Sequence, residues 1–200
     1  MKKYSGRSLI VFYLLSLMTW PSFAELTVDI TQGAEGAVPI AVVPFSQPSL
    51  PGDTMSEIVA MDLHGSGKFS IMRESLLPER PVPPSVPEFP LWQGSGQEHV
   101  VIGRVTSGEG GSLVAEFVLY DAIRGVQSLS ERISFKPSEA RHTAHRIADM
   151  IFKFLTGERG VFNTRVAYVA ASGYGMEREY RLVIADTDGE GDRIVISSPE

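Results

Sequence analysis

Two histidines, His142 and His145, have the residue type and spacing most suggestive of chemistry. Residues three apart in a helix lie on neighbouring positions of one face, as a pair of metal ligands requires. No carboxylate with an obvious third-ligand spacing accompanies them, and Arg141 and Arg146 beside them would repel a cation. We therefore interpret His145, which borders an apolar stripe, as a packed or surface histidine.

A second candidate is the acidic cluster Asp186, Asp188 and Glu190, which is followed by Gly191 and resembles the first half of a calcium-binding EF-hand loop. Position twelve of that loop, where a bidentate glutamate is needed, falls on Ser197. A strand pattern rather than a helix precedes the cluster. The sequence therefore favours a polar hairpin turn here, for which Asp-Gly is a strong signal.

Other reactive motifs are missing from the sequence. It contains no cysteine, which excludes disulfides, thiolate metal sites and cysteine nucleophiles. It has neither a Gly-x-Ser-x-Gly nucleophile elbow nor a Walker phosphate loop. A carboxylate pair of the kind that hydrolyses glycosides stays open, because sequence alone does not identify one. We predict no catalytic, cofactor-binding or metal-binding residue, and no cofactor.

The composition is that of an ordinary globular protein. Of the 200 residues, 43% are hydrophobic and 21% are charged, and the formal net charge is −6. These values argue against a disordered chain, a collagen-like repeat or a multi-span membrane protein. The negative charge argues against broad electrostatic binding to nucleic acid.

Residues 1–24 have the pattern of a secretory signal peptide. A basic start is followed by an apolar run over Ser8 to Trp20, then by Pro21 and the small residues Ser22 and Ala24. The apolar run is shorter than the ~20 residues that cross a bilayer as a helix. We expect cleavage before Glu25, a periplasmic protein in a bacterium and no membrane insertion of the mature chain, although an uncleaved anchor stays open as the weaker alternative.

The next part, residues 25–157, alternates between strand and helix patterns and predicts an α/β (α+β) domain. Thr54 and Glu57 have the spacing of a capping box, and Gly157 ends a long helix that Pro137 and Ser138 open. The expected strands cover residues 39–45, 69–72, 99–106, 113–121 and 128–135.

Six prolines between Leu77 and Pro90 exclude a central strand or helix there. Their PxxP spacing is compatible with a polyproline ligand, but a semi-rigid surface loop is the favoured interpretation.

Residues 158–200 contain only short strand patterns, at 165–171, 180–185 and 193–197. Three strands without a covering helix do not close a core. Because propeller blades have four strands, we expect these residues to be the incomplete first blade of a β-propeller.

The first nine residues after the expected cleavage site alternate between apolar and polar side chains, as a strand does. A strand between a free end and glycines is easily released, and a released strand can add to the sheet edge of a partner. Leu26, Val28 and Ile30 share one face and Asp29 lies on the other. The candidate partner-binding residues are Glu25, Leu26, Thr27, Val28, Asp29, Ile30, Thr31, Gln32 and Gly33.

Several of these motifs together resemble the TolB family of the Tol-Pal system. The most specific runs are Leu155-Thr156-Gly157 and Thr164-Arg165-Val166-Ala167-Tyr168-Val169, with weaker matches at Pro39 to Phe45 and Val100 to Val105. The resemblance implies an N-terminal α/β domain before a six-bladed propeller. It also implies that residues 25–33 bind TolA and that the propeller binds the outer-membrane lipoprotein Pal.

On this resemblance we expect a non-enzymatic protein that links inner-membrane TolA to Pal and supports outer-membrane integrity and invagination during cell division. Two alternatives stay open. One is an exported hydrolase in which a propeller covers an active site. The other is a periplasmic ligand-binding module with an aromatic pocket, to which Tyr168, Tyr174 and Tyr180 would contribute.

Overall fold

The computed structural model describes residues 36–48, 54–174 and 178–198. All of the described elements belong to one compact unit, Gln32–Glu200. The expected signal peptide and the candidate partner-binding strand, residues 25–33, lie outside the described residues.

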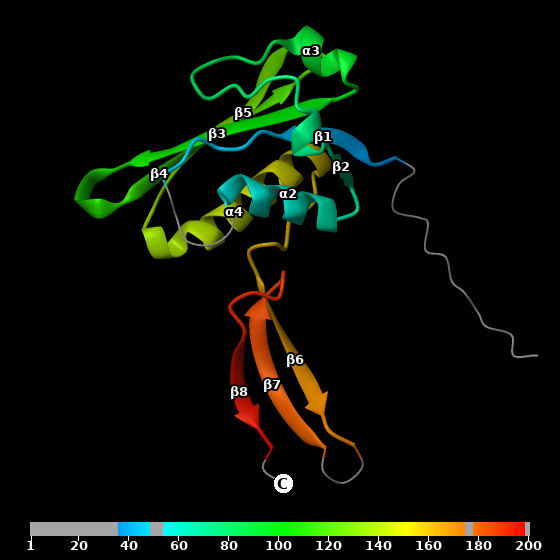
Figure 1. The fold of residues 1–200 in the computed structure, drawn as a ribbon, viewed down its shortest axis with the longest axis vertical. Coiled ribbons are helices and arrows are strands. Elements are labelled where there is room, and N and C mark those ends of the chain that lie inside the picture. Colours follow the sequence, from blue (N-terminus) through cyan, green and yellow to red (C-terminus); the bar gives the residue numbers. More distant parts are fainter. Residues whose placement is uncertain (1–35, 49–53, 175–177, 199–200) are drawn as a thin grey trace, which may run out of the picture. The chain divides into compact units, whose positions relative to one another are not determined.

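Five strands form a mixed sheet in the order β2-β1-β3-β4-β5 (Figure 1). β1 (Val38–Val42) pairs in parallel with both β2 (Phe69–Ile71) and β3 (His99–Ser107). β4 (Leu113–Asp121) and β5 (Val126–Phe135) continue the sheet as an antiparallel meander. The predicted mixed α/β class and the meander are confirmed.

β1 and the residues after it are buried on both faces of the sheet, as the unbroken apolar run predicts. Ile40 and Val42 belong to one buried cluster, whereas Ala41 and Val43 belong to the cluster on the opposite face. Parallel strands with both faces covered read as continuous apolar runs rather than as alternating ones.

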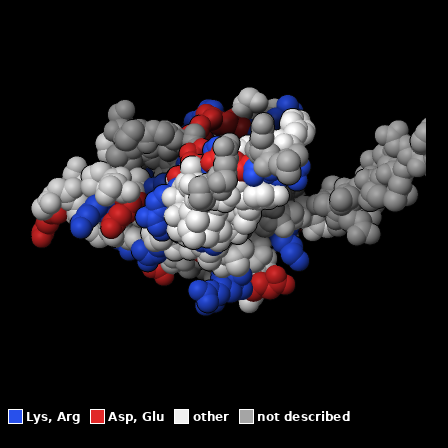
Figure 2. Space-filling view, turned by 90° about the horizontal axis from the view of Figure 1, so that it is seen from below, with Lys and Arg blue, Asp and Glu red and all other residues white. Residues whose placement is uncertain are grey.

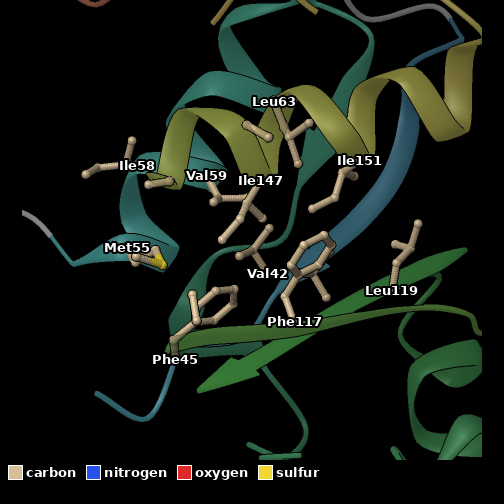
Figure 3. Close-up of a cluster of buried hydrophobic side chains, with 14 of the residues drawn as sticks. Val42, Phe45, Met55, Ile58, Val59, Leu63, Phe117, Leu119, Ile147 and Ile151 are labelled. Carbon is tan, nitrogen blue, oxygen red and sulfur yellow. The ribbon is translucent and has the colours of Figure 1, made fainter. Parts of the chain in front are cut away.

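Helix α2 (Met55–Gly65) begins with the predicted capping box. The Thr54 hydroxyl accepts from the Glu57 amide at 3.3 Å, and the Glu57 carboxylate accepts from the Thr54 amide at 2.7 Å. These two bonds satisfy amides that lack partners within the helix. The apolar stripe of α2 packs toward the sheet, and Figure 3 shows Met55, Ile58, Val59 and Leu63 in this core.

Helix α4 (Ala140–Thr156) follows a 3₁₀ turn at Pro137–Glu139 and ends at Gly157, which adopts a left-handed conformation with φ of +75°. The predicted start and stop of this helix are confirmed. Its buried residues include Ile147 and Ile151, which face the core beside α2 (Figure 3). α2 and α4 together cover one face of the sheet (Figure 1).

The proline-rich segment covers the other face of the sheet, with the short helix α3 (Phe89–Gly94) (Figure 1). A 3₁₀ turn, Glu74–Leu76, leads into it. Trp92 is fully buried and donates through Nε1 to Glu79 Oε1 at 2.6 Å. Because Leu77 is buried with Trp92 in the same cluster, the segment forms a packed layer rather than a free polyproline ligand. α3 is not predicted by the sequence.

A second sheet contains β6 (Arg165–Ser172), β7 (Glu179–Asp186) and β8 (Arg193–Ser197), all antiparallel. Both of its faces are apolar. The register places Val166 and Tyr168 on one face and Val169 on the other, and all three side chains are at least 41% exposed.

The surface of the described residues carries both signs of charge. On the face drawn in Figure 2, lysine and arginine are interspersed with aspartate and glutamate rather than gathered into one field. In the described part of the chain, no helix has the length and apolar character needed to cross a membrane.

Candidate functional site

A buried aspartate–histidine pair joins the two helices of the main core. Asp62 of α2 and His145 of α4 are 7% and 1% exposed, and Asp62 Oδ2 lies 2.7 Å from His145 Nδ1. Buried charges are costly unless they are paired, and this pair satisfies one carboxylate oxygen and one ring nitrogen. The contact fixes α2 against α4 at a point where both helices otherwise bury apolar side chains.

The second ring nitrogen of His145 faces the β7–β8 turn, which comprises residues 187–192. Nε2 lies 3.3 Å from Asp188 Oδ2, a distance for an ion pair, although the contact lacks the geometry of a hydrogen bond. Asp188 also accepts a hydrogen bond from Arg141, one turn before His145 in α4. We name Asp62, Arg141, His145 and Asp188 the junction cluster.

The charges and the burial of the junction cluster shift the pKa values of His145 and Asp62. Burial alone would lower the pKa of His145, but the hydrogen bond and charge of Asp62 and the charge of Asp188 outweigh it, so that pKa is raised. Burial raises the pKa of Asp62 despite its contact with His145. Both shifts mean that the Asp62–His145 pair holds a proton to higher pH than the separate groups would.

Asp188 behaves in the opposite way to Asp62. Burial alone would raise the pKa of Asp188, but the amide of Glu190, the Arg141 guanidinium and His145 outweigh it and lower that pKa. Asp188 is therefore the anionic carboxylate that faces Nε2 of His145.

Asp149 binds the segment that connects α4 to β6 through hydrogen bonds. Its two carboxylate oxygens accept from the amides of Phe162 at 2.9 Å and of Asn163 at 3.3 Å. Gly160 passes so close to α4 that a Cβ there would lie 2.9 Å from the Asp149 Cα. The Thr187 hydroxyl donates to the Phe162 carbonyl at 2.8 Å, which ties this segment to the β7–β8 turn.

Two pockets border the junction cluster. One, of about 290 Å³, is lined by Met61, Asp62, Gly65, Phe162, Thr187 and Asp188. The other, of about 180 Å³, is lined by His142, His145, Phe162, Asn163, Thr164, Arg165 and Asp186. Phe162 lines both pockets, and its ring packs edge-on against Phe152 at 5.5 Å between centroids.

The residues singled out by the sequence fall into different places. His145 is packed, as expected, whereas His142 is exposed on the same helix. No group of three or more potential metal ligands occurs within residues 36–48, 54–174 and 178–198. The Asp186–Glu190 cluster forms a hairpin turn in which Asp186 N donates to Glu190 O at 2.9 Å.

The sequence did not identify the junction cluster. Asp62 lies among the buried residues of α2, where helical periodicity predicts an apolar side chain, and the sequence predicts only a hairpin turn at Asp188. The available signal was a charged residue within the apolar stripe of one helix and a histidine beside the stripe of another. Neither position indicates its partner, because Asp62 and His145 are 83 residues apart.

The Asp62–His145 arrangement has the first two members of a serine-protease triad, an aspartate and a histidine. In such a triad the second nitrogen of the histidine takes a proton from a hydroxyl nucleophile. Here that nitrogen faces the Asp188 carboxylate, which is no nucleophile of this type. The arrangement therefore suits the holding of a proton and of the β7–β8 turn rather than acyl transfer.

Residues 26–128, just over half of the chain, match the family model of the TolB amino-terminal domain. The Tol-Pal system protein TolB of Methylococcus capsulatus is 46% identical over 95% of this chain. Its counterpart in Thioalkalivibrio sulfidiphilus is 38% identical over 99% of the chain. The chain spans 45% and 46% of the lengths of these two relatives.

The fold agrees with a solved structure as well. The crystal structure of TolB from Acinetobacter baumannii superimposes with a TM-score of 0.70 at 34% identity. The match covers 81% of this chain and 39% of that one.

Proposed function

Because this chain belongs to the TolB family of Tol-Pal system proteins, we propose that it is a periplasmic, non-enzymatic component that links TolA of the inner membrane to the lipoprotein Pal of the outer membrane. The observation that carries the proposal is the family match over residues 26–128, supported by relatives that align with nearly the whole chain. Such a link would support outer-membrane integrity and invagination during cell division.

We assign TolA binding to residues 25–33. Their alternation gives one apolar face, Leu26, Val28 and Ile30, and one polar face. An extended segment of this kind binds by adding a strand to a sheet edge of its partner, where main-chain hydrogen bonds supply affinity and alternate side chains supply specificity.

We assign Pal binding to a propeller of which β6, β7 and β8 form the start of the first blade. The support from the described residues is the apolar character of both faces of this sheet, with Val166 and Tyr168 on one face and Val169 on the other. A sheet that is apolar on both faces is stable in water only when other elements cover both. Neighbouring blades of a propeller would provide that cover. On this proposal the chain has three parts. Residues 1–24 are a signal peptide that is removed, residues 25–157 are the N-terminal α/β domain, and residues 158–200 are the start of the propeller.

The assignment of TolA binding is tested by charge substitution on the two faces of the segment in the full-length protein. We expect Val28→Asp to weaken binding of the TolA C-terminal domain at least about tenfold in calorimetric titration, or about 1.4 kcal/mol. Thr27→Asp, its neighbour on the opposite face, is the matched control and should have a smaller effect. Equal losses from the two variants would contradict strand addition, and an absence of binding by the unchanged protein would contradict the proposed partner.

A further inference from the structure

A buried histidine held between two carboxylates is the feature that the proposed function leaves unused. His145 is 1% exposed, with Asp62 Oδ2 at 2.7 Å from Nδ1 and Asp188 Oδ2 at 3.3 Å from Nε2. The two carboxylates come from different parts of the fold. Asp62 belongs to α2, whereas Asp188 belongs to the β7–β8 turn.

Only the protonated ring satisfies both carboxylates. An imidazolium carries a positive charge and a proton on each nitrogen, so it attracts a carboxylate on either side, whereas a neutral imidazole carries one proton and one lone pair. The shorter contact, to Asp62, retains the single proton of the neutral ring. The lone pair of Nε2 then faces an oxygen of the Asp188 carboxylate, and the two repel each other.

We propose that protonation of His145 controls the docking of the β7–β8 turn on the α2–α4 helix pair. The imidazolium holds Asp188 and with it the turn. Loss of the proton replaces that attraction with a repulsion and loosens the turn. Arg141 keeps its hydrogen bond with Asp188 in both states, so the turn is loosened rather than detached.

Several other charged groups lie near His145, and none of them replaces it as the group whose protonation controls the turn. Asp149 of α4 adds a further negative charge that acts on Asp62. On the side of the smaller pocket, Arg165 Nε lies 3.5 Å from Asp186 Oδ1, so a positive and a negative charge lie next to each other there. His142 lines the same pocket but is exposed. The charged and titratable groups around His145 are therefore the carboxylates of Asp62, Asp149, Asp186 and Asp188 and the basic side chains of Arg141, His142 and Arg165.

The direction of the effect follows from linkage. The contact with Asp188 contributes to the raised pKa of docked His145, so docking is favoured at pH values below that pKa. This stabilisation of the docked turn is lost as the pH rises through the pKa of docked His145. A difference of half a pKa unit between the docked and loosened states changes the docking equilibrium about threefold.

The test is hydrogen exchange of the β7–β8 turn in the full-length protein, corrected for the intrinsic effect of pH on exchange. Protection is compared at about pH 5.5 and about pH 8.5, on either side of the ordinary histidine range. We expect protection of residues 187–192 to fall about threefold at the higher pH. His142→Gln, which removes an exposed histidine from the same helix, is the matched control and should show the same fall.

Two variants separate a proton-controlled contact from a merely structural one. His145→Gln should lose the pH step and show low protection throughout. Asp188→Asn keeps the Asp62–His145 pair, and its amide either accepts from a protonated Nε2 or donates to an unprotonated one. It should therefore lose the pH step and show the same protection at both pH values. A pH step that persists in either variant, or no step in the unchanged protein, would overturn the proposal, and Asp188→Asn alone decides it if His145→Gln does not fold.

Discussion

Asp62 and His145 lie 83 residues apart in the sequence, yet Asp62 Oδ2 and His145 Nδ1 are 2.7 Å apart in the buried contact between α2 and α4. The pair replaces apolar packing at one point of the helix pair with a specific polar contact. A buried pair of this kind fixes the register of two elements, because any slide of one helix along the other would leave a carboxylate unpaired.

We predict that Asp62→Ala destabilises the protein by about 3 kcal/mol, because it leaves His145 buried without its closest partner. Chemical denaturation measures the free energy of unfolding. Glu131→Ala, which removes an exposed carboxylate from β5, should change it by less than about 0.5 kcal/mol. Equal effects of the two variants would contradict a structural role for the pair.

The lowered pKa of Asp188 predicts a second pH dependence, on the acid side. A carboxylate whose pKa is lowered by folding contributes stability above its ordinary value of 3.8, and loses that contribution as the pH falls through its lowered value. The urea midpoint of the unchanged protein should exceed that of Asp188→Asn near neutral pH. The gap should close below pH 3.8. A gap that is constant from neutral to acid pH would show that Asp188 contributes no charge-dependent stability. Asp62 acts in the opposite direction, since its raised pKa favours the folded state as it becomes protonated.

Asp149→Ala should cost about 1 to 2 kcal/mol, because the amides of Phe162 and Asn163 lose their acceptors. Faster hydrogen exchange at these two amides should accompany the loss. Lys153→Ala, an exposed change one turn further along α4, is the control and should leave both amides unchanged. If the amides keep their protection in Asp149→Ala, the carboxylate does not hold the connecting segment.

Most of the elements were predictable because their signals are local. The capping box of Thr54 and Glu57, the left-handed Gly157 and the β3–β5 meander each depend on neighbours within a few residues. α3 was not predicted, because Pro87 and Pro90 flank its start and a single turn carries little periodicity. Pro90 is nevertheless accommodated in the first turn, where a missing amide hydrogen costs nothing.

The junction cluster was not predictable, because it depends on tertiary contact. Asp62 takes a core-facing position of α2, where periodicity alone indicates an apolar residue. Asp188 has every property of a hairpin residue, and its second role depends on where the β7–β8 turn meets α4. A sequence pattern reports which face of an element is buried, but it does not report which partner lies opposite.

The apolar faces of the β6–β8 sheet predict that a polar substitution there improves the isolated segment 25–200 but destabilises the full-length protein. Val169 is 62% exposed, so Val169→Thr should raise the solubility of the isolated segment 25–200. In the full-length protein, where we expect a neighbouring blade to cover this face, it should cost about 1 to 2 kcal/mol. Val86→Thr, at a side chain 59% exposed in the proline-rich layer, is the control and should be neutral in both. A neutral Val169→Thr in the full-length protein would contradict the propeller.

The most direct test of the proposed function is calorimetric titration of the TolA C-terminal domain into the full-length protein with and without residues 25–36. Circular dichroism first establishes that both forms are folded. We predict that TolA binds the form that begins at Glu25 and that the loss of residues 25–36 abolishes binding. Equal affinity for the two folded forms, or binding to neither, would contradict the assignment of TolA binding to this segment.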